Sequence, residues 1–303
     1  MSRRATGIAL AFATAAISGV AVFVNSYGVK HFGDATVYTT AKNGVAGLLL
    51  LGFALAATAS STRWRDPAWM PRTPARWAAL LTVAVVGGSI PFVLFFEGLS
   101  RASATQAAFI HKTLVVWVAI LAVPLLRERL GPAHLAAVAL LLAGQAAIVG
   151  EAGTVTFGTG EAMILAATLL WAVEVVLVKH LLGSFASPTL AAGRLGLGTL
   201  LLVGYLALSG RLGAVAGLGL EQWGWALLTG LLLAGYAVTW YAALSRAPAV
   251  DVTAVLVLAT VVTAALERGL DGVPLDTAGL GLIVVGVALV AALALRRPEP
   301  AHA

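Results

Sequence analysis

Residues 98–130 read GLSRASATQAAFIHKTLVVWVAILAVPLLRERL: an arginine-marked turn, a long apolar segment carrying His111 and Lys112, and a basic end. A second stretch, residues 243–270, reads ALSRAPAVDVTAVLVLATVVTAALERGL. The LSRA of residues 99–102 recurs there at residues 244–247, an offset of 244 − 99 = 145. Each turn is followed by an apolar run of about 20 residues, the length of a membrane span. The sequence therefore contains one internal repeat.

The composition is that of a polytopic membrane protein. Of the 303 residues, 60% are hydrophobic and 11% are charged, and the mean hydropathy is +0.96. Soluble domains carry roughly 25% charged residues. The absence of cysteine excludes disulfides, thiolate metal ligands and thiol catalysis. The sequence pI of 10.1 does not indicate nucleic-acid binding, because the basic residues lie between apolar runs, where they set membrane orientation.

Apolar windows bounded by charge, proline or glycine predict an all-α membrane protein of ten transmembrane helices. The N-terminal apolar run has no obvious cleavage site, so we expect it to be a retained first span. The longest connection, residues 60–76, is polar and proline-rich and is interpreted as an interfacial loop. The expected spans are residues 5–28, 36–59, 77–99, 103–125, 132–150, 160–180, 188–208, 222–244, 249–267 and 277–295.

The distribution of Lys and Arg over alternate loops predicts the orientation, since cytoplasmic loops carry the excess. The richer side holds Arg3, Arg4, Arg63, Arg65, Arg72, Arg76, Arg127, Arg129, Lys179, Arg246, Arg296 and Arg297. The other side holds Lys30, Arg101, Arg211 and Arg268. We therefore expect both termini in the cytoplasm of a multi-pass protein of the inner or plasma membrane.

Five spans per copy is an odd number, so the second copy enters the membrane from the opposite side. This predicts two inverted five-helix repeats, residues 1–150 and 151–303, an arrangement typical of transporters that work by alternating access. Weaker matches extend the repeat: Lys42 corresponds to Arg194 once a one-residue gap is allowed, and Asn25 corresponds to Glu174.

Several short patterns, in order along the chain, resemble the drug/metabolite transporter superfamily, specifically its ten-helix type with two EamA-like domains. They are FEGLSRA at 96–102, PLLRERL at 124–130, Trp171-Ala172, Gly144 and Gly286. The resemblance implies a cavity lined by spans one to four and six to nine, with five and ten peripheral. It also implies a monomer or homodimer that moves small metabolites or drugs, frequently outward. One departure is that Glu128 has Val273, not an acid, at the 145 offset.

Six of the ionisable residues within the expected spans are the site candidates. A charge at mid-span costs about 2.5–3.5 kcal/mol on insertion scales, so it usually faces a cavity or a partner. The structural alternatives are an interhelical ion pair for His111 and Lys112, contact with interfacial water for Glu97, and a neutral acid bonded to a neighbouring helix for Glu174. Lys42 and Arg194 could instead extend their side chains to the membrane surface. The cations are Lys42, Lys112 and Arg194, the acids Glu97 and Glu174, and the titratable neutral residue is His111.

His111 and Lys112 point about 100° apart on a helix, so we expect one to line the cavity and the other to contact a neighbouring span. Glu97 lies about one turn below the outer end of the preceding antiparallel span and Lys112 a turn or so deeper, which places a Glu97–Lys112 pair within side-chain reach. Glu97 and Glu174 are the candidates for carrying a coupling proton, because burial favours the neutral acid. Lys42 and Arg194 are expected at the two mouths of the cavity.

Aromatic side chains that fit the cavity wall are Trp117, Trp171, Tyr236, Trp240 and Tyr241. Pro91, which follows the pair Gly87-Gly88, predicts a kink in the third span. We interpret this kink as a candidate gate, with irregular packing as the alternative.

The predicted function is secondary transport, in the export direction, of a small metabolite that carries a carboxylate, such as an amino acid, because intramembrane cations outnumber acids. One alternative is a proton-coupled efflux transporter of cationic drugs. The alternative from another class is an intramembrane enzyme or a membrane scaffold. Nucleotide-binding, metalloprotease and serine-hydrolase motifs are missing, so we expect no enzyme activity, metal or cofactor. The expected partners are the substrate, the bilayer and, for coupling, a proton.

Overall fold

The computed structural model describes residues 2–60, 71, 73–102, 104–150 and 157–296, so the expected loop at 60–76 lies largely outside the described residues. Helices make up all the regular structure in this part of the chain. The first half contains α1 (Arg3–Gly28), η1 (Val29–His31), α2 (Ala35–Ser60), α3 (Pro74–Val83), η4 (Ala84–Ser89), α4 (Ile90–Leu99), α5 (Ala104–Lys112), α6 (Leu114–Leu126) and α7 (Pro132–Gly150). The second half contains α8 (Thr159–Leu181), α9 (Ser187–Leu208), α10 (Leu212–Ala216), α11 (Leu220–Leu244), α12 (Ala249–Leu256), α13 (Ala259–Leu266), η5 (Glu267–Asp271) and α14 (Thr277–Arg296).

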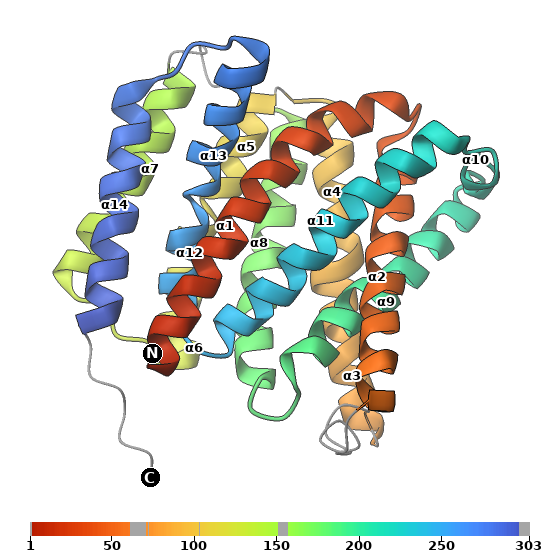
Figure 1. The fold of residues 1–303 in the computed structure, drawn as a ribbon, viewed down its shortest axis with the longest axis horizontal. Coiled ribbons are helices and arrows are strands. Elements are labelled where there is room, and N and C mark those ends of the chain that lie inside the picture. Colours follow the sequence, from red (N-terminus) through yellow and green to blue (C-terminus); the bar gives the residue numbers. More distant parts are fainter. Residues whose placement is uncertain (1, 61–70, 72, 103, 151–156, 297–303) are drawn as a thin grey trace.

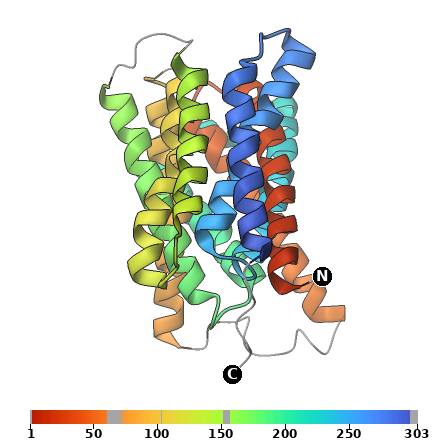
Figure 2. The same cartoon turned by 90° about the vertical axis from the view of Figure 1, so that its left-hand side faces the viewer.

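The long helices run back and forth across one bundle. α1 begins and α14 ends at the same end of the molecule, and α10 lies at the opposite end (Figures 1 and 2). Within the described residues, eight helical runs are long and apolar enough to cross a bilayer. α7 counts as a shorter apolar helix over Pro132–Ile148. The chain is thus an all-helical membrane protein with about ten long helical runs.

Three of the expected spans are interrupted. The third consists of α3, the π-helix η4 and α4; η4 includes Gly87 and Gly88, and Pro91 lies in the first turn of α4. The regular α-helix is thus interrupted where the sequence predicts a kink, since π-turns and proline both disturb the helical hydrogen bonds. The fourth span breaks at Thr113 and the ninth at residues 257–258. The offset of 145 relates these two breaks, because 113 + 145 = 258.

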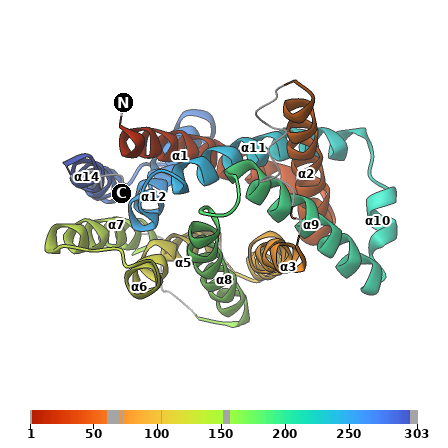
Figure 3. The same ribbon diagram turned by 90° about the horizontal axis from the view of Figure 1, so that it is seen from below.

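α7 and α14 pack against each other at one edge of the bundle (Figures 1 and 3). Glycines permit this close approach: a Cβ added at Gly144 would lie 2.6 Å from the Gly279 carbonyl oxygen. One added at Gly286 would lie 2.9 Å from a Leu141 methyl carbon. Small residues at helix interfaces are a main source of packing energy in membranes, where lipid competes for apolar contact.

The end of the bundle near the termini is held by two sets of side-chain to backbone hydrogen bonds, one between the two halves (Glu128) and one within the second half (Lys179). The Glu128 carboxylate accepts hydrogen bonds from the backbone N–H groups of Ala249 (2.6 Å) and Val250 (3.1 Å), which caps α12. The Lys179 ammonium donates to the carbonyls of Leu244 and Ala247 at 2.5 and 2.6 Å. These bonds satisfy backbone groups that a helix end would otherwise leave unpaired.

Replacing Gly88 by alanine should destabilise the protein by about 2–3 kcal/mol, because an extra methyl group in a tightly packed interface forces the backbone to move. The added Cβ would lie 2.1 Å from the Arg194 carbonyl oxygen and 3.2 Å from the Gly198 Cα, both backbone atoms. Thermal unfolding in detergent measures the effect. Gly204→Ala is the control, since nothing lies within 4 Å of its Cβ position, and equal melting temperatures for the two variants would contradict the packing.

Candidate functional site

A cavity of about 160 Å³ lies inside the bundle. α1, α2, α4, α5, α6, α8, α9, α11 and α12 contribute to its wall. These are the first to fourth and sixth to ninth spans, and α7 and α14 contribute none of the described lining residues. The lining elements are therefore those that the family resemblance implies.

Seven of the candidates from the sequence line this cavity. They are Lys42, His111, Trp171, Glu174, Arg194, Tyr236 and Trp240. Tyr241 lies behind the wall, fully buried, and contacts Glu174. Residues from both halves of the chain thus meet at one cavity inside the bundle.

In the first half, Lys42 is buried and has no carboxylate partner among the described residues. Its ammonium lies 3.4 Å from Asn25 Oδ1, which also accepts a hydrogen bond from the Tyr38 hydroxyl. Aromatic rings surround the rest of it, with the Phe96 and Phe92 centroids 4.7 and 5.8 Å away. Cation–π contacts stabilise an ammonium without neutralising its charge.

In the second half, Arg194 is paired. Its Nε lies 3.9 Å from Glu174 Oε1, and both side chains are buried. The Tyr241 hydroxyl donates to the same carboxylate oxygen at 2.5 Å. Arg194 Nε and Trp171 Nε1 also donate to the Gly87 carbonyl, each at 3.1 Å. The Gly87 carbonyl belongs to the π-helix, so that irregular turn supplies an acceptor to the site.

The two clusters are related by the sequence repeat. Aligning the two repeats pairs Lys42 with Arg194 and Asn25 with Glu174. The offset of 145 pairs Phe96 with Tyr241. The difference is that an acid stands beside the cation in one half and an amide in the other. The cavity consequently has one compensated and one uncompensated cation.

His111 lies in the last turn of α5, one residue before its end at Lys112 and next to the break at Thr113. Its ring lies edge-on to Trp171 (4.9 Å between centroids) and to Phe95 (5.4 Å), and its buried Nδ1 has no hydrogen-bond partner within the described structure. Of the adjacent pair, therefore, His111 lines the cavity and Lys112 does not. Trp117 is also outside the lining and donates from Nε1 to Thr113 Oγ1 at 3.0 Å.

Glu97 lies outside the cavity, and the expected Glu97–Lys112 pair is not among the ion pairs of the described residues. Its carboxylate instead contacts Arg211 Nη1 at 3.3 Å and Arg101 Nη2 at 3.6 Å, and accepts from the Thr36 hydroxyl at 3.1 Å. The sequence expectation failed because depth along a helix does not determine which neighbour lies across from it. Arg211 arrives from the turn after α9, 114 residues away.

Asp34 shares Arg211 with Glu97, at 2.9 Å from Nη1, and caps α2 by accepting from the N–H groups of Thr36 and Val37. Burial alone would raise the pKa of Asp34, but these bonds from Val37, Arg211 and Thr36 outweigh it. The net result is a pKa below the usual value. This cluster lies at the end of the bundle opposite the termini.

Asp34→Ala should lower stability by about 1 kcal/mol at neutral pH, the usual effect of losing a helix N-cap. Because the folded-state pKa is lowered, the carboxylate stabilises fully above about pH 4, its unfolded value, and progressively less below it. The melting-temperature gap between wild type and variant should therefore stay constant from pH 7 to about pH 4 and narrow below that. A gap independent of pH down to pH 3 would contradict this role.

The sequence-based candidates missed Asn25, Ser18, Phe92 and Thr229, which also line the cavity. Asn25 was detectable, because the repeat register pairs it with Glu174. The others are ordinary in an apolar span and carry no signal of their own. Within the described chain, no group of three or more metal-ligating side chains is arranged to hold a metal ion.

Comparison with known proteins places this geometry in a family. A model of the EamA-like transporter family matches twice, at residues 5–150 and 158–292. The chain is 30% identical over 194 residues to an uncharacterized transporter of Archaeoglobus fulgidus, covering 62% of this chain and 66% of that protein, just under two thirds. A protein of known crystal structure superposes with a TM-score of 0.76 at 19% identity, over 97% of this chain and 100% of that one, which shows a shared fold. The chain belongs to the EamA-like transporter family and is a membrane transporter rather than an enzyme.

Proposed function

We propose that this protein is a secondary transporter that exports a small carboxylate-bearing metabolite, such as an amino acid, by alternating access. The substrate binds in the cavity between the two halves. Its carboxylate pairs with the Lys42 ammonium. The aromatic wall, including Trp171, Tyr236 and Trp240, contacts the remainder of the molecule.

One observation carries the proposal: Lys42 lies in the cavity wall beside an amide and aromatic rings, and no carboxylate of the described residues pairs with it. A cation within the membrane that has no anionic partner costs free energy, and binding of an anion from outside the protein lowers that cost. Arg194, by contrast, has Glu174. A substrate carboxylate would pair with Lys42 in the first half as the Glu174 carboxylate pairs with Arg194 in the second.

Alternating access follows from ten spans arranged as two inverted repeats, residues 1–150 and 151–303. The paired breaks at Thr113 and at 257–258 support this arrangement. So does the opposite course of the broken helices in Figure 1, where α5 precedes α6 downward and α12 precedes α13 upward. The Glu128 and Lys179 contacts at one end and the Glu97–Arg211–Asp34 cluster at the other are the gates that open in turn. The loop charges assign the end with the termini to the cytoplasm.

Glu174 is the coupling group in this proposal. Its carboxylate is shared between Arg194 and Tyr241, so protonation would release Arg194 to the cavity. Glu97 belongs to the Glu97–Arg211–Asp34 gate and is a gating residue rather than the coupling group. The rival function, export of cationic drugs, requires an acid free to receive the cation, and both acids are engaged by arginine.

Proteoliposomes test the function directly. Purified protein is reconstituted and offered radiolabelled amino acids, nucleobases and cationic dyes at two imposed pH gradients. We expect uptake of at least one carboxylate-bearing compound and none of its decarboxylated amine. Uptake of the dyes alone would establish the cationic-drug alternative, and no transport of any class would favour a scaffold.

A further inference from the structure

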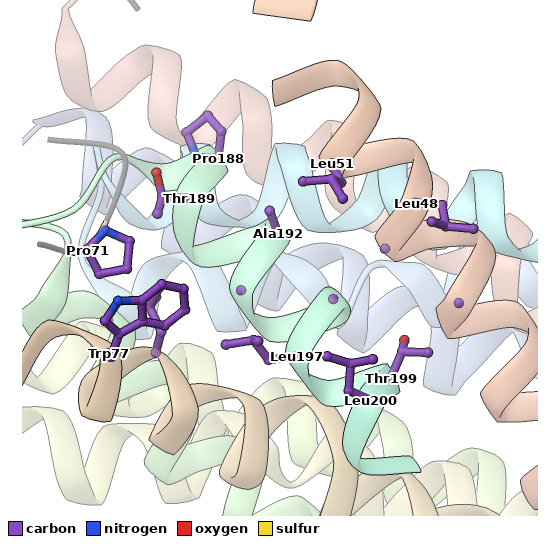
Figure 4. A pocket seen from close by; sticks show the side chains of 15 residues that line it. Leu48, Leu51, Pro71, Trp77, Pro188, Thr189, Ala192, Leu197, Thr199 and Leu200 are labelled. Carbon is purple, nitrogen blue, oxygen red and sulfur yellow. The ribbon is translucent and has the colours of Figure 1, made fainter. Parts of the chain in front are cut away.

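A second hollow lies on the outside of the bundle, between α2, α3 and α9 (Figure 4). It is a groove of about 530 Å³ in the half of the bundle that contains the start of α9 and the end of α2. Its walls include Leu48 and Leu51 of α2, Trp77 of α3, and Ala192 and Leu200 of α9. It shares no lining residue with the central cavity. It is therefore a separate site.

Glycines form the floor of the groove. A Cβ added at Gly47 would lie 3.2 Å from the Gly196 Cα, so α2 and α9 touch there through backbone. A Cβ at Gly196 would meet nothing within 4 Å, so its face of α9 opens into the hollow. Side chains then rise on both sides, which gives the groove depth as well as length.

The groove faces the bilayer. Leu48 is 71% exposed, Leu200 66% and Trp77 45%, and these side chains rim it. In a multi-pass membrane protein, apolar surface exposed at this depth contacts lipid chains. A hollow of this volume with an almost wholly apolar lining fits an acyl chain.

The charge at the end of the groove selects the kind of lipid. Arg76 precedes Trp77 of the wall, and its guanidinium lies 5.4 Å from the Phe185 ring, close to where α9 begins at Ser187. A basic side chain at the headgroup level of a membrane helix attracts anionic lipid.

We propose that this groove binds one acyl chain of an anionic phospholipid, with the lipid phosphate paired to Arg76. The lipid fills the gap that the glycines leave between α2, α3 and α9. Since α9 carries Arg194 and α2 carries Lys42, the bound chain lies against the two helices that supply the cavity cations.

Two matched variants of α9 test the acyl site. Gly196→Leu fills the groove, and Gly204→Leu adds the same side chain two turns away, outside the lining, where nothing lies within 4 Å either. Both changes raise helix propensity, so both proteins should fold. Arg76→Gln tests the headgroup contact separately.

Each full-length protein is reconstituted in nanodiscs of equimolar phosphatidylglycerol and phosphatidylcholine, and the lipids it retains are counted by native mass spectrometry. We expect wild type and Gly204→Leu to retain one phosphatidylglycerol with about tenfold preference, corresponding to one charge-assisted contact. Gly196→Leu should lose the retained lipid, and Arg76→Gln should retain lipid without headgroup preference. Equal retention by Gly196→Leu and Gly204→Leu would overturn the proposal, as would the absence of retained lipid in wild type. A wild-type dimer that only Gly196→Leu disrupts would also overturn it, by identifying a second copy as the occupant.

Discussion

Replacing Lys42 by methionine is expected to reduce transport of the carboxylate-bearing substrate by about 100-fold. A charge-assisted hydrogen bond contributes about 1.5–3 kcal/mol, and about 1.4 kcal/mol corresponds to a factor of ten. Stability should move the other way. Methionine has a similar length and no charge, so removal of an unpaired buried ammonium should leave the melting temperature unchanged or raise it. Initial transport rates in proteoliposomes and thermal unfolding in detergent measure the two effects.

Lys112→Met is the matched control, because Lys112 is also a cation within a span but does not line the cavity. The transport rate of Lys112→Met should remain within about threefold of the wild-type rate. This is a smaller effect than the tenfold change that corresponds to about 1.4 kcal/mol. Lys42→Arg keeps the charge and should keep most of the activity. Equal losses in Lys42→Met and Lys112→Met would mean that the position of the charge in the cavity is irrelevant.

Replacing Arg194 by methionine is expected to destabilise the protein by about 3–5 kcal/mol, the usual effect of removing one partner of a buried ion pair. The change leaves the Glu174 carboxylate buried with only Tyr241, and removes one of the two donors to the Gly87 carbonyl. The double variant Arg194→Met/Glu174→Met should regain most of the lost stability, because no unpaired charge then remains. Thermal unfolding of the single and double variants measures both.

Arg101→Met supplies the comparison. Arg101 pairs with Glu97 at 3.6 Å, but its side chain is half exposed, and such pairs contribute about 0–1 kcal/mol. If Arg194→Met and Arg101→Met shifted the melting temperature equally, the second-half pair would not be the buried element described here.

The fold was largely predictable because membrane spans leave a strong one-dimensional signal. Long apolar runs between charged loops gave the helices, and the LSRA repeat gave the two halves. The interruptions were less visible. Gly87-Gly88 with Pro91 marked the π-helix in the third span, but nothing local distinguishes Thr113 or Leu258 from a continuous helix. Their relation appears only when the offset of 145 is applied to the observed breaks.

The site was predictable in its members and not in its pairings. Charge within a span identified Lys42, Glu174 and Arg194, because such residues need a cavity or a partner. Which residue faces which depends on helix rotation and crossing, which a sequence does not contain. Glu97 therefore belongs with Arg211 rather than Lys112. The acid at 128, which lacked a counterpart in the repeat, caps α12 across the boundary between the halves.

In the proposed mechanism, Lys42 recognises a substrate carboxylate in the cavity. The most direct measurement compares transport of the substrate found in the proteoliposome panel with that of its carboxamide, in wild type and in Lys42→Met. Wild type should prefer the carboxylate by about 100-fold and the variant by less than about threefold, because a loss of about 2.8 kcal/mol corresponds to a factor of about 100. An unchanged preference in Lys42→Met would show that Lys42 does not bind the carboxylate.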